Sequence, residues 1–473
     1  MNSRSYRWLL LAFAVGAALV FLYPDADQQD AGYHYLFARW SWIEPQYLVS
    51  VWARPLFTLA YAVPSLGGYP LAKFFTLLIA LATAWQSARF ASDLGIQNAE
   101  LAIPLIFLQP AFFLVCSVTL TEPLFALILV LALRLDLRGF KTWAAVLVSL
   151  LILVRPEGFF VGLAWGFWVL FGRSHEEPLY PRLARASLLS GGAAAWWAVT
   201  TVASGDPLWL VHNWPPDWKP VNESNIRGQF WWYFAILPLI VGPLFLPQFF
   251  SGLVSLWRSR RATAGLLILA VIFLVHAAMF SRGWFGDAGY PRYLVCVAPV
   301  TALATLEGWN RFRLAQKHVL SVLLLLLSFG VCLSYVDGYR FTRDSRAIDD
   351  VLKAVDLSRV SYQKLIFSQS YSCIRLGCTP SQWFALSSSK AENIERLQKA
   401  SEPTLVIWDN DVGPKWYGLT HDDFKMLGFT TVAERDYIIP GWFLQLPWKR
   451  HGGPRVQGMH ILYRNATSEA KRP

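Results

Sequence analysis

The sequence predicts an α-helical polytopic membrane protein with a small α/β domain at its C-terminal end. Three observations lead to this fold class. Of the 473 residues, 55% are hydrophobic and only 15% are charged, whereas about a quarter of the residues of a soluble domain are charged. The apolar residues form long runs that short basic stretches separate. From residue 339 onward this pattern ends, so we predict a membrane domain over residues 1–338 and a second domain over 339–473.

The apolar runs predict about eleven transmembrane segments. A membrane-spanning helix needs about 20 mostly apolar residues, or fewer where its neighbours bury its ends. Runs on either side of Ser117 and of Arg155 are short, which indicates helices that turn back without crossing the whole bilayer. The runs are residues 8–22, 70–90, 101–116, 120–134, 142–154, 158–172, 186–204, 231–257, 264–280, 293–308 and 318–336.

Lysine and arginine clusters between these runs predict the orientation of the chain. The positive-inside rule places such clusters in the cytoplasm. In an eleven-segment count they all fall on one side with the N-terminus, so the C-terminal domain is expected outside the cytoplasm. The net charge of +11 is then a topology signal, and no nucleic-acid partner is predicted. The clusters are Arg4 and Arg7; Arg134, Arg138 and Lys141; Arg173, Arg182 and Arg185; Arg258, Arg260 and Arg261; and Arg311, Arg313 and Lys317.

Residues 339–473 are predicted to fold as a small α/β domain outside the cytoplasm, because short apolar strands alternate with amphipathic helices. We find no glycine-rich phosphate loop and no metal-ligand spacing in this stretch. The expected helices are residues 347–355 and 390–399, and the expected strands are 364–368, 404–408 and 460–463.

The five cysteines divide into two groups. Cys373 and Cys378 lie in the C-terminal domain, where an oxidising compartment would allow them to form a disulfide. Cys116, Cys296 and Cys332 lie in apolar runs and are expected to be buried as small hydrophobic side chains.

The stretch 23–42 concentrates polar chemistry directly after the first apolar run. Clustered carboxylates at the end of a membrane segment indicate either a solvated loop or a catalytic carboxylate at the mouth of a cavity in the membrane. Apolar stretches at residues 47–52 and 55–61 of the same outer loop predict helices that lie along the membrane surface. The carboxylates are Asp25, Asp27 and Asp30, and His34 and Arg39 follow them.

Other charged residues interrupt the apolar runs on the predicted outer side. Glu122 precedes a proline at a helix start, where it either complements the helix dipole or points into a cavity. Arg155 and Glu157 flank a proline, where they either form an ion pair across a turn or orient a substrate.

A glycine-rich turn near the tenth run carries two further arginines, Arg282 and Arg292. Each either reaches a lipid phosphate at the interface or holds a substrate phosphate with its planar fork. His212 has no partner that is visible in the sequence.

The order of these motifs resembles the GT-C superfamily of membrane glycosyltransferases, which use lipid-phosphate-linked sugars and include mannosyltransferases and aminoarabinose transferases. The resemblance covers roughly residues 5–310. Its motifs are DAGYHYLFAR at residues 30–39, TEPLF at 121–125 with RPEG at 155–158, and RY at 292–293. A soluble domain on the outer face is also common in that superfamily.

The resemblance implies a glycosyltransferase that moves a sugar from a polyprenyl-phosphate donor to an acceptor hydroxyl on a lipid, glycan or protein. Members place an essential Asp in the first outer loop, and Asp30 matches best, with Ala31 where many members have a second acid. No cofactor is expected, although Asp25 and Asp27 share the D-x-D spacing that binds a divalent metal in other glycosyltransferases. The implied catalytic candidates are Asp30, Asp27 and Asp25, and the implied substrate-binding candidates are His34, Arg39, Glu122, Arg155, Glu157, Arg282, Arg292 and Tyr293.

Two other functional classes stay open at this point. A transporter or flippase for a lipid or sugar would place ionisable residues near mid-membrane and often shows inverted repeats. A scaffold would bind a partner through its outer domain without catalysis. The charges cluster at one face and no repeat is evident, which favours the glycosyltransferase. The expected location is a bacterial or archaeal plasma membrane or the endoplasmic reticulum, with membrane lipids as further partners.

Overall fold

The computed structural model describes residues 3–25, 29–172, 177–215, 227–338, 343–357, 360–439 and 455–465. The chain divides into two compact units. The first, called the membrane unit here, consists of Met1–Leu22, Phe37–Ser41 and Pro45–Val336. The second, called the C-terminal unit, consists of Tyr23–Leu36, Trp42–Glu44 and Asp337–Pro473. The acidic stretch after the first helix therefore groups with the C-terminal residues.

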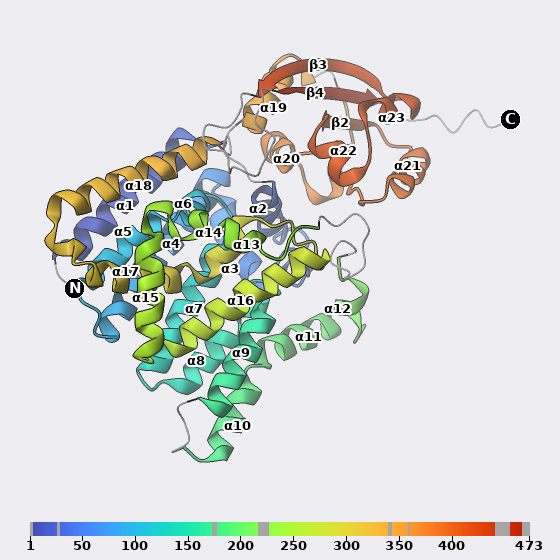
Figure 1. The fold of residues 1–473 in the computed structure, drawn as a ribbon. Helices are drawn as coiled ribbons and strands as arrows, with labels where there is room; N and C mark the ends of the chain where they lie inside the picture. Colours follow the sequence, from blue (N-terminus) through green and yellow to red (C-terminus); the bar gives the residue numbers. More distant parts are fainter. Residues whose placement is uncertain are drawn as a thin grey trace. The chain divides into compact units, whose positions relative to one another are not determined.

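Four helices of the described chain are long and apolar enough to cross a membrane by length and composition. This finding and the apolar composition make the chain an integral membrane protein, as predicted. The number of membrane-spanning segments stays a prediction, because most of the other helices are short. The four long helices are α1 (Ser3–Leu22), α4 (Tyr69–Asp93), α16 (Thr263–Arg282) and α18 (His318–Gly338), and Figure 1 labels them.

The remaining predicted segments are helical, but several of them are interrupted. The run 142–154, for example, divides into α8 (Lys141–Ser149) and a short 3-10 helix, η3 (Leu151–Leu153). The run 101–116 breaks before Pro110, since a proline disfavours helical backbone in the residue that precedes it. The run 186–204 breaks near Ser190, and 231–257 breaks into three helices around Pro238 and Gly242. The helices are α5 (Ala102–Phe107), α6 (Pro110–Val115), α7 (Glu122–Leu137), α8 (Lys141–Ser149), α9 (Gly158–Phe171), α10 (Leu179–Leu188), α11 (Gly191–Ser204), α13 (Trp232–Ala235), α14 (Leu237–Val241), α15 (Leu246–Arg258) and α17 (Ala298–Arg311).

The loop between the first two long helices differs in part from its prediction. Residues 55–61 are helical, within α3 (Pro55–Leu66), as predicted. The predicted helix at 47–52 is wrong, because the short η1 (Pro45–Leu48) ends at Leu48 and turns follow it. The sequence did not predict α2 (Asp30–Trp40). A further short helix, α12 (Trp209–His212), follows α11, and its His212 pairs with Asp206 at 2.7 Å. His212 is thus partnered close by in the chain.

Close backbone contact between α15 and α17 holds the segment that leads into the candidate site. A Cβ added at Gly252 would lie 1.7 Å from the carbonyl oxygen of Ala304, and one added at Gly308 would lie 1.8 Å from that of Gln248. Only glycine permits this approach, as at small-residue crossings of membrane helices. The helix α17 directly continues η6 (Pro291–Val297), so the packing also fixes η6.

The C-terminal unit contains a four-stranded mixed sheet, which confirms the α/β prediction. Its strand order is β1-β2-β4-β3, with β1 and β2 parallel and the other two pairs antiparallel. The sequence does not predict β3, because this edge strand exposes most of its side chains and lacks an apolar run. The strands are β1 (Lys364–Phe367), β2 (Thr404–Asp409), β3 (Thr430–Ile439) and β4 (Arg455–Arg464).

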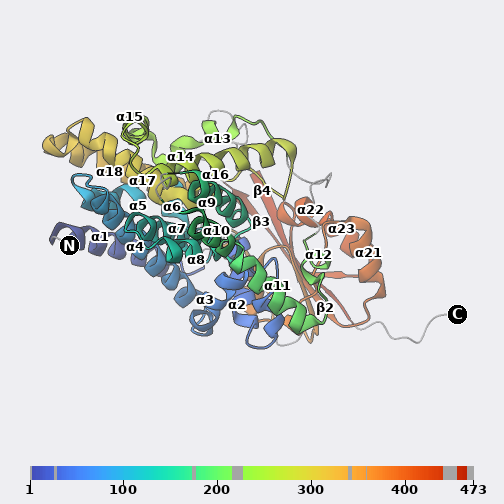
Figure 2. The same ribbon diagram turned by 90° about the horizontal axis from the view of Figure 1, so that it is seen from below.

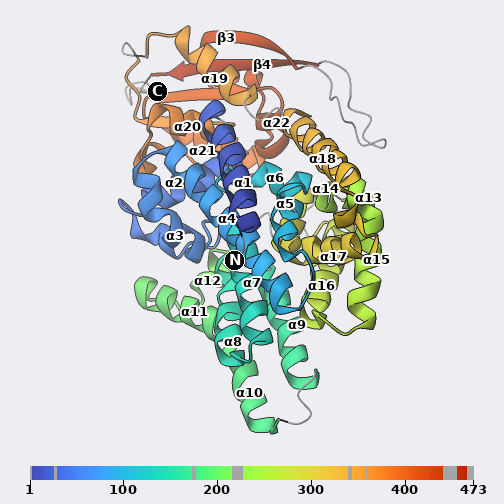
Figure 3. The same cartoon turned by 90° about the vertical axis from the view of Figure 1, so that its left-hand side faces the viewer.

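Helices cover both faces of this sheet. On one face Leu397 and Phe424 pack against Trp408 in a buried core. On the other face, the Tyr437 hydroxyl donates to the carbonyl of Ala347 at 2.8 Å, and Figure 3 shows α19 crossing β3 and β4. The helices are α19 (Arg343–Lys353), α20 (Ser370–Leu376), α21 (Lys390–Lys399), α22 (Val412–Tyr417) and α23 (His421–Met426).

The cysteines behave as their positions predict. Cys373 of α20 and Cys378 form a disulfide, which closes the end of this helix. Cys116, Cys296 and Cys332 are free and buried.

Candidate functional site

Polar side chains from six segments of the membrane unit meet in a buried cluster. They come from the start of α7, the turn before α9, the short helix α13, the second half of α16, the loop after it and η6. Two of these segments, α9 and α16, lie side by side (Figures 1 and 2). We call this set the buried polar cluster, and its members are Thr121, Glu122, Arg155, Glu157, Tyr233, His276, Asp287, Arg292 and Tyr293.

Arg155 lies at the centre of this cluster. Its guanidinium Nη1 is 2.7 Å from Oε1 of Glu122, and its Nη2 is 2.7 Å from Oε1 of Glu157. Nη1 also donates to Oγ1 of Thr121 at 2.9 Å. Glu122 is only 1% exposed and Arg155 only 6%. The predicted ion pair between Arg155 and Glu157 therefore exists, and the Glu122 carboxylate, which also lies at a helix start, is buried against the same guanidinium.

An imidazole links this ion-pair system to a third carboxylate. His276 Nδ1 lies 2.7 Å from Oδ2 of Asp287, and its Nε2 lies 3.6 Å from Oε1 of Glu157. The Tyr233 hydroxyl donates to Oδ1 of Asp287 at 2.8 Å, and the backbone N–H of Gly289 donates to the same oxygen at 2.8 Å. Asp287 is thereby held on both oxygens, so the imidazole orientation is fixed as well.

Tyr293 supplies an aromatic surface between the cations and the imidazole. Its ring stacks on His276 with centroids 5.3 Å apart. The guanidinium carbons of Arg155 and Arg292 lie 5.4 and 5.5 Å from its centroid, within the range of cation–π attraction. Arg292 Nε also approaches Oε1 of Glu122 at 4.0 Å. The R-Y motif thus joins the cluster through both of its residues.

The charges of this cluster nearly balance. Three carboxylates face two guanidinium groups and one imidazole. Buried charges are strongly unfavourable unless they are paired, and inside a membrane protein they usually mark a functional site. Because each charge has an oppositely charged partner, the protein can fold with these groups buried. Burying them still costs free energy, which indicates that the cluster has a role beyond stability.

Two of the predicted arginines lie outside the cluster. Arg282 is the last residue of α16 and its side chain is exposed. Arg39 is also exposed, and its Nη1 donates to the carbonyl of Ser65 near the end of α3 at 3.1 Å. In the sequence these two arginines are substrate-binding candidates like Arg292, but in the fold only Arg292 joins the buried polar cluster.

The acidic stretch belongs to the C-terminal unit, and there it is helical at Asp30 instead of forming an open loop. Asp30 is the first residue of α2, where the helix dipole stabilises a carboxylate. His34 follows one turn later and is buried, so the two side chains lie on the same helix face. Asp25 is half-buried, and Asp27 lies outside the described residues.

The C-terminal unit holds the residue that precedes Asp30 in an unusual backbone conformation. Gln29 has φ of 37°, which is rare outside glycine. Its carbonyl accepts from the Ser370 hydroxyl at 2.7 Å, and its side-chain amide donates to the carbonyl of Ser368 at 3.3 Å. One turn further, the Tyr33 hydroxyl lies 3.0 Å from that of Tyr417. These contacts fix the start of α2, in agreement with strained backbone being maintained by its surroundings.

Several buried polar residues were not recognisable from the sequence as site candidates. His276 and Tyr233 lie in apolar runs without a recognisable motif. Lys73 of α4 is fully buried, with its ammonium 5.4 Å from the ring centroid of Tyr69. One lysine inside the run 70–90 is a usable signal, because a cation at membrane depth usually has a functional partner.

The helices of the membrane unit and the sheet of the C-terminal unit confirm the predicted fold class, an α-helical polytopic membrane protein with a small C-terminal α/β domain. Known structures with this fold are crystal structures of ArnT from Cupriavidus metallidurans, one bound to undecaprenyl phosphate and one in the apo state. The TM-scores are 0.61 and 0.60, at 12% and 13% sequence identity. The similarity covers 98% of this chain in both cases, and 99% and 98% of the ArnT chains.

Comparisons of the sequence itself gave no match, either to a protein-family model or to a curated protein. The similarity to ArnT is therefore a similarity of fold.

Proposed function

We propose that this chain is a glycosyltransferase that moves a sugar from a polyprenyl-phosphate donor to an acceptor hydroxyl. The observation that carries the proposal is the fold similarity over 98% of the chain to a protein whose structure holds undecaprenyl phosphate. The buried polar cluster supports it, since it contains Arg155 and Arg292, and a guanidinium group suits a phosphate. The proposed acceptor class is a lipid, glycan or protein hydroxyl.

The proposed chemistry needs few protein groups. The leaving group is a phosphate that is already anionic, so no general acid is required. One carboxylate suffices as general base, taking the proton of the acceptor hydroxyl as its oxygen attacks the anomeric carbon. Attack opposite to the leaving phosphate inverts the anomeric centre, through an oxocarbenium-like transition state as in glycoside hydrolysis. We assign the base to Asp30, with Asp27 and Asp25 as the alternatives.

The cluster is assigned to the phosphate side of the reaction. Arg292 would stabilise the charge that grows on the leaving phosphate, which is the transition-state role of preorganised cations. Glu122 and Arg155 would hold Arg292 and Tyr293 in position. His276 and Asp287 would keep Glu157 oriented toward Arg155.

The direct test is turnover with a panel of radiolabelled polyprenyl-phosphate sugars and purified protein in detergent. The proposal requires that at least one donor releases polyprenyl phosphate, and that release increases when acceptor lipids, glycans or peptides are added. Transport of labelled lipid across vesicles without any release of polyprenyl phosphate would favour the transporter or flippase class. No release and no transport across the whole panel would overturn both assignments.

Arg292→Lys is expected to lower kcat/KM by about 10- to 100-fold. A lysine keeps the charge but not the two-pronged contact, and hydrogen bonds to charged groups contribute about 1.5–3 kcal/mol each. Turnover and donor binding would be measured on detergent-purified protein. Arg282→Lys is the matched control, because this arginine is exposed at the end of α16, and it should retain full activity. Equal activity in both variants would remove the phosphate role of Arg292.

A topology reporter tests the proposed orientation, with the C-terminal unit outside the cytoplasm of a bacterial or archaeal cell or in the lumen of the endoplasmic reticulum. Alkaline phosphatase, which needs disulfides to fold, should be active when fused after Pro473, because all basic clusters are assigned to the cytoplasmic side. The same reporter fused after Arg138, in one of those clusters, should be inactive. The reverse pattern would overturn the orientation and the placement of the acids on the outer side.

A further inference from the structure

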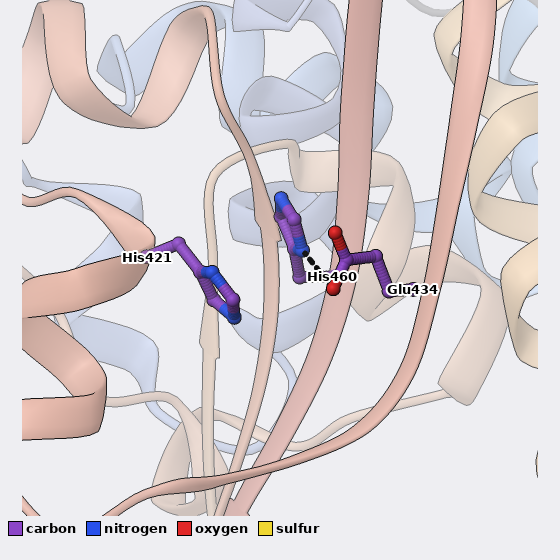
Figure 4. Close-up of side chains that lie close together, drawn as sticks. All are labelled: His421, Glu434 and His460. Carbon is purple, nitrogen blue, oxygen red and sulfur yellow. Dashed lines mark ion pairs between the residues drawn. The ribbon is translucent and has the colours of Figure 1, made fainter.

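Three side chains that are distant in the sequence meet at the edge of the C-terminal sheet. Glu434 of β3 and His460 of β4 are directly paired across the two strands. His421, at the start of α23, lies over the same face, with its ring stacked on that of His460 at 4.0 Å between centroids (Figure 4). One potential ligand atom from each of the three lies within 4.8 Å of the others. No metal-ligand spacing is recognisable in the sequence of this domain, because the β3–β4 register brings together residues that are far apart in the chain.

Nδ1 of His460, the ring nitrogen that faces the Glu434 carboxylate, has no hydrogen-bond partner among the described residues. His460 is buried, and its Nδ1 lies 3.7 Å from Oε2 of Glu434, which is too long for a hydrogen bond. Two ligands that are each about 2.0–2.2 Å from a tetrahedral ion are roughly 3.3–3.6 Å apart. The separation of these two atoms is therefore close to that of two ligands of one ion.

A hydrogen-bond partner holds one of the two rings. His421 Nε2 lies 3.0 Å from the hydroxyl of Thr431 on β3, which leaves its Nδ1 for an ion. Gly458 leaves room for His460, since a Cβ at this glycine would lie 2.9 Å from His460 Nε2. Imidazole ligands of metal ions are commonly oriented by a hydrogen bond of their second nitrogen.

We propose that His421, Glu434 and His460 bind a divalent transition-metal ion of the zinc class at the edge of the C-terminal sheet. Two imidazoles and one carboxylate suit zinc, cobalt or nickel, whereas calcium and magnesium prefer sites built from oxygen ligands. Glu434 is largely exposed, so water supplies the remaining ligand. Binding requires the stacked rings to turn, because the ion lies in the plane of each ring that it contacts. The ion would tie α23 to β3 and β4.

The test uses the full-length chain, purified without a polyhistidine tag and stripped of metal with a chelator. Cobalt titration should produce visible d–d absorption that saturates at one ion per chain, and zinc should displace it. Glu434→Gln and His421→Asn replace accessible side chains and should weaken binding by at least about tenfold, since even outer-shell changes cost 10- to 100-fold. Zinc should raise the unfolding temperature of the parent chain and not that of Glu434→Gln.

His212→Asn is the matched control. This exposed histidine also faces a carboxylate, Asp206, at 2.7 Å, but lies in the membrane unit, and its replacement should leave cobalt binding unchanged. Binding that is lost equally in all three variants would indicate general adsorption to histidines and overturn the site. The absence of saturable cobalt absorption in the parent chain would overturn it as well. Weaker binding at acidic pH in the parent chain would support imidazole ligands.

Discussion

Asp30→Asn is expected to lower turnover by about 10²- to 10⁴-fold, the range for loss of a general base. The amide has the same shape as the carboxylate but cannot accept the proton of the acceptor hydroxyl. Donor binding and folding should change little, because the cost of removing one charge at a helix start is about 0.3–1 kcal/mol. Turnover and donor binding would be measured separately, in membranes with matched expression.

The neighbouring acids provide the controls for this variant. Asp25→Asn and Asp27→Asn should each cost less than Asp30→Asn if these residues only tune the local field. An active Asp30→Asn together with an inactive Asp27→Asn would move the base to Asp27. Full activity in all three variants would remove the catalytic assignment of the stretch.

Arg155→Met is expected to destabilise the membrane unit by about 3–5 kcal/mol, the cost of removing one partner from a buried ion pair. Glu122 and Glu157 would both lose their nearest cation while they remain buried. The yield of folded protein and its unfolding temperature in detergent would measure the effect. Activity should be lost along with stability.

A triple variant separates stability from function in this cluster. Glu122→Gln, Arg155→Met and Glu157→Gln together remove the charges, so most of the stability should return while activity stays low. Arg138→Met is the matched control, because Arg138 is partly exposed and its partner Asp93 keeps a second arginine, Arg134. An exposed pair contributes about 0–1 kcal/mol. Equal stability of Arg155→Met and Arg138→Met would contradict the buried-charge interpretation.

The sequence by itself determined the fold class and most element positions. Apolar runs of sufficient length and amphipathic periods are local properties, so they are visible without any knowledge of neighbours. The predicted helix 390–399 matches α21 at both ends, where Ser389 accepts a capping hydrogen bond from Glu392. Breaks such as Gly242, with φ of 99°, and the exposed edge strand β3 were missed, because neither interrupts or creates an apolar run.

For the candidate site, too, the sequence identified some residues, while the tertiary structure determined which of them come together. Glu122, Arg155, Glu157 and Arg292 were recognisable because charge in an apolar run is costly wherever it occurs. Only the tertiary structure decided that they share one cluster. It also separated Arg282 from Arg292, since one is at an exposed helix end and the other enters η6 beside Glu122.

Partners of a polar group depend on distant segments, and only the folded chain sets them. A histidine in an apolar run looks like a core residue until Asp287 is found 2.7 Å away from His276. Glu434 and His460 meet because the β3–β4 register pairs them, and His421 joins them because α23 covers the same face. Hydropathy is a sum over neighbouring residues, whereas electrostatic partnership and metal geometry depend on packing between residues that are far apart in the chain.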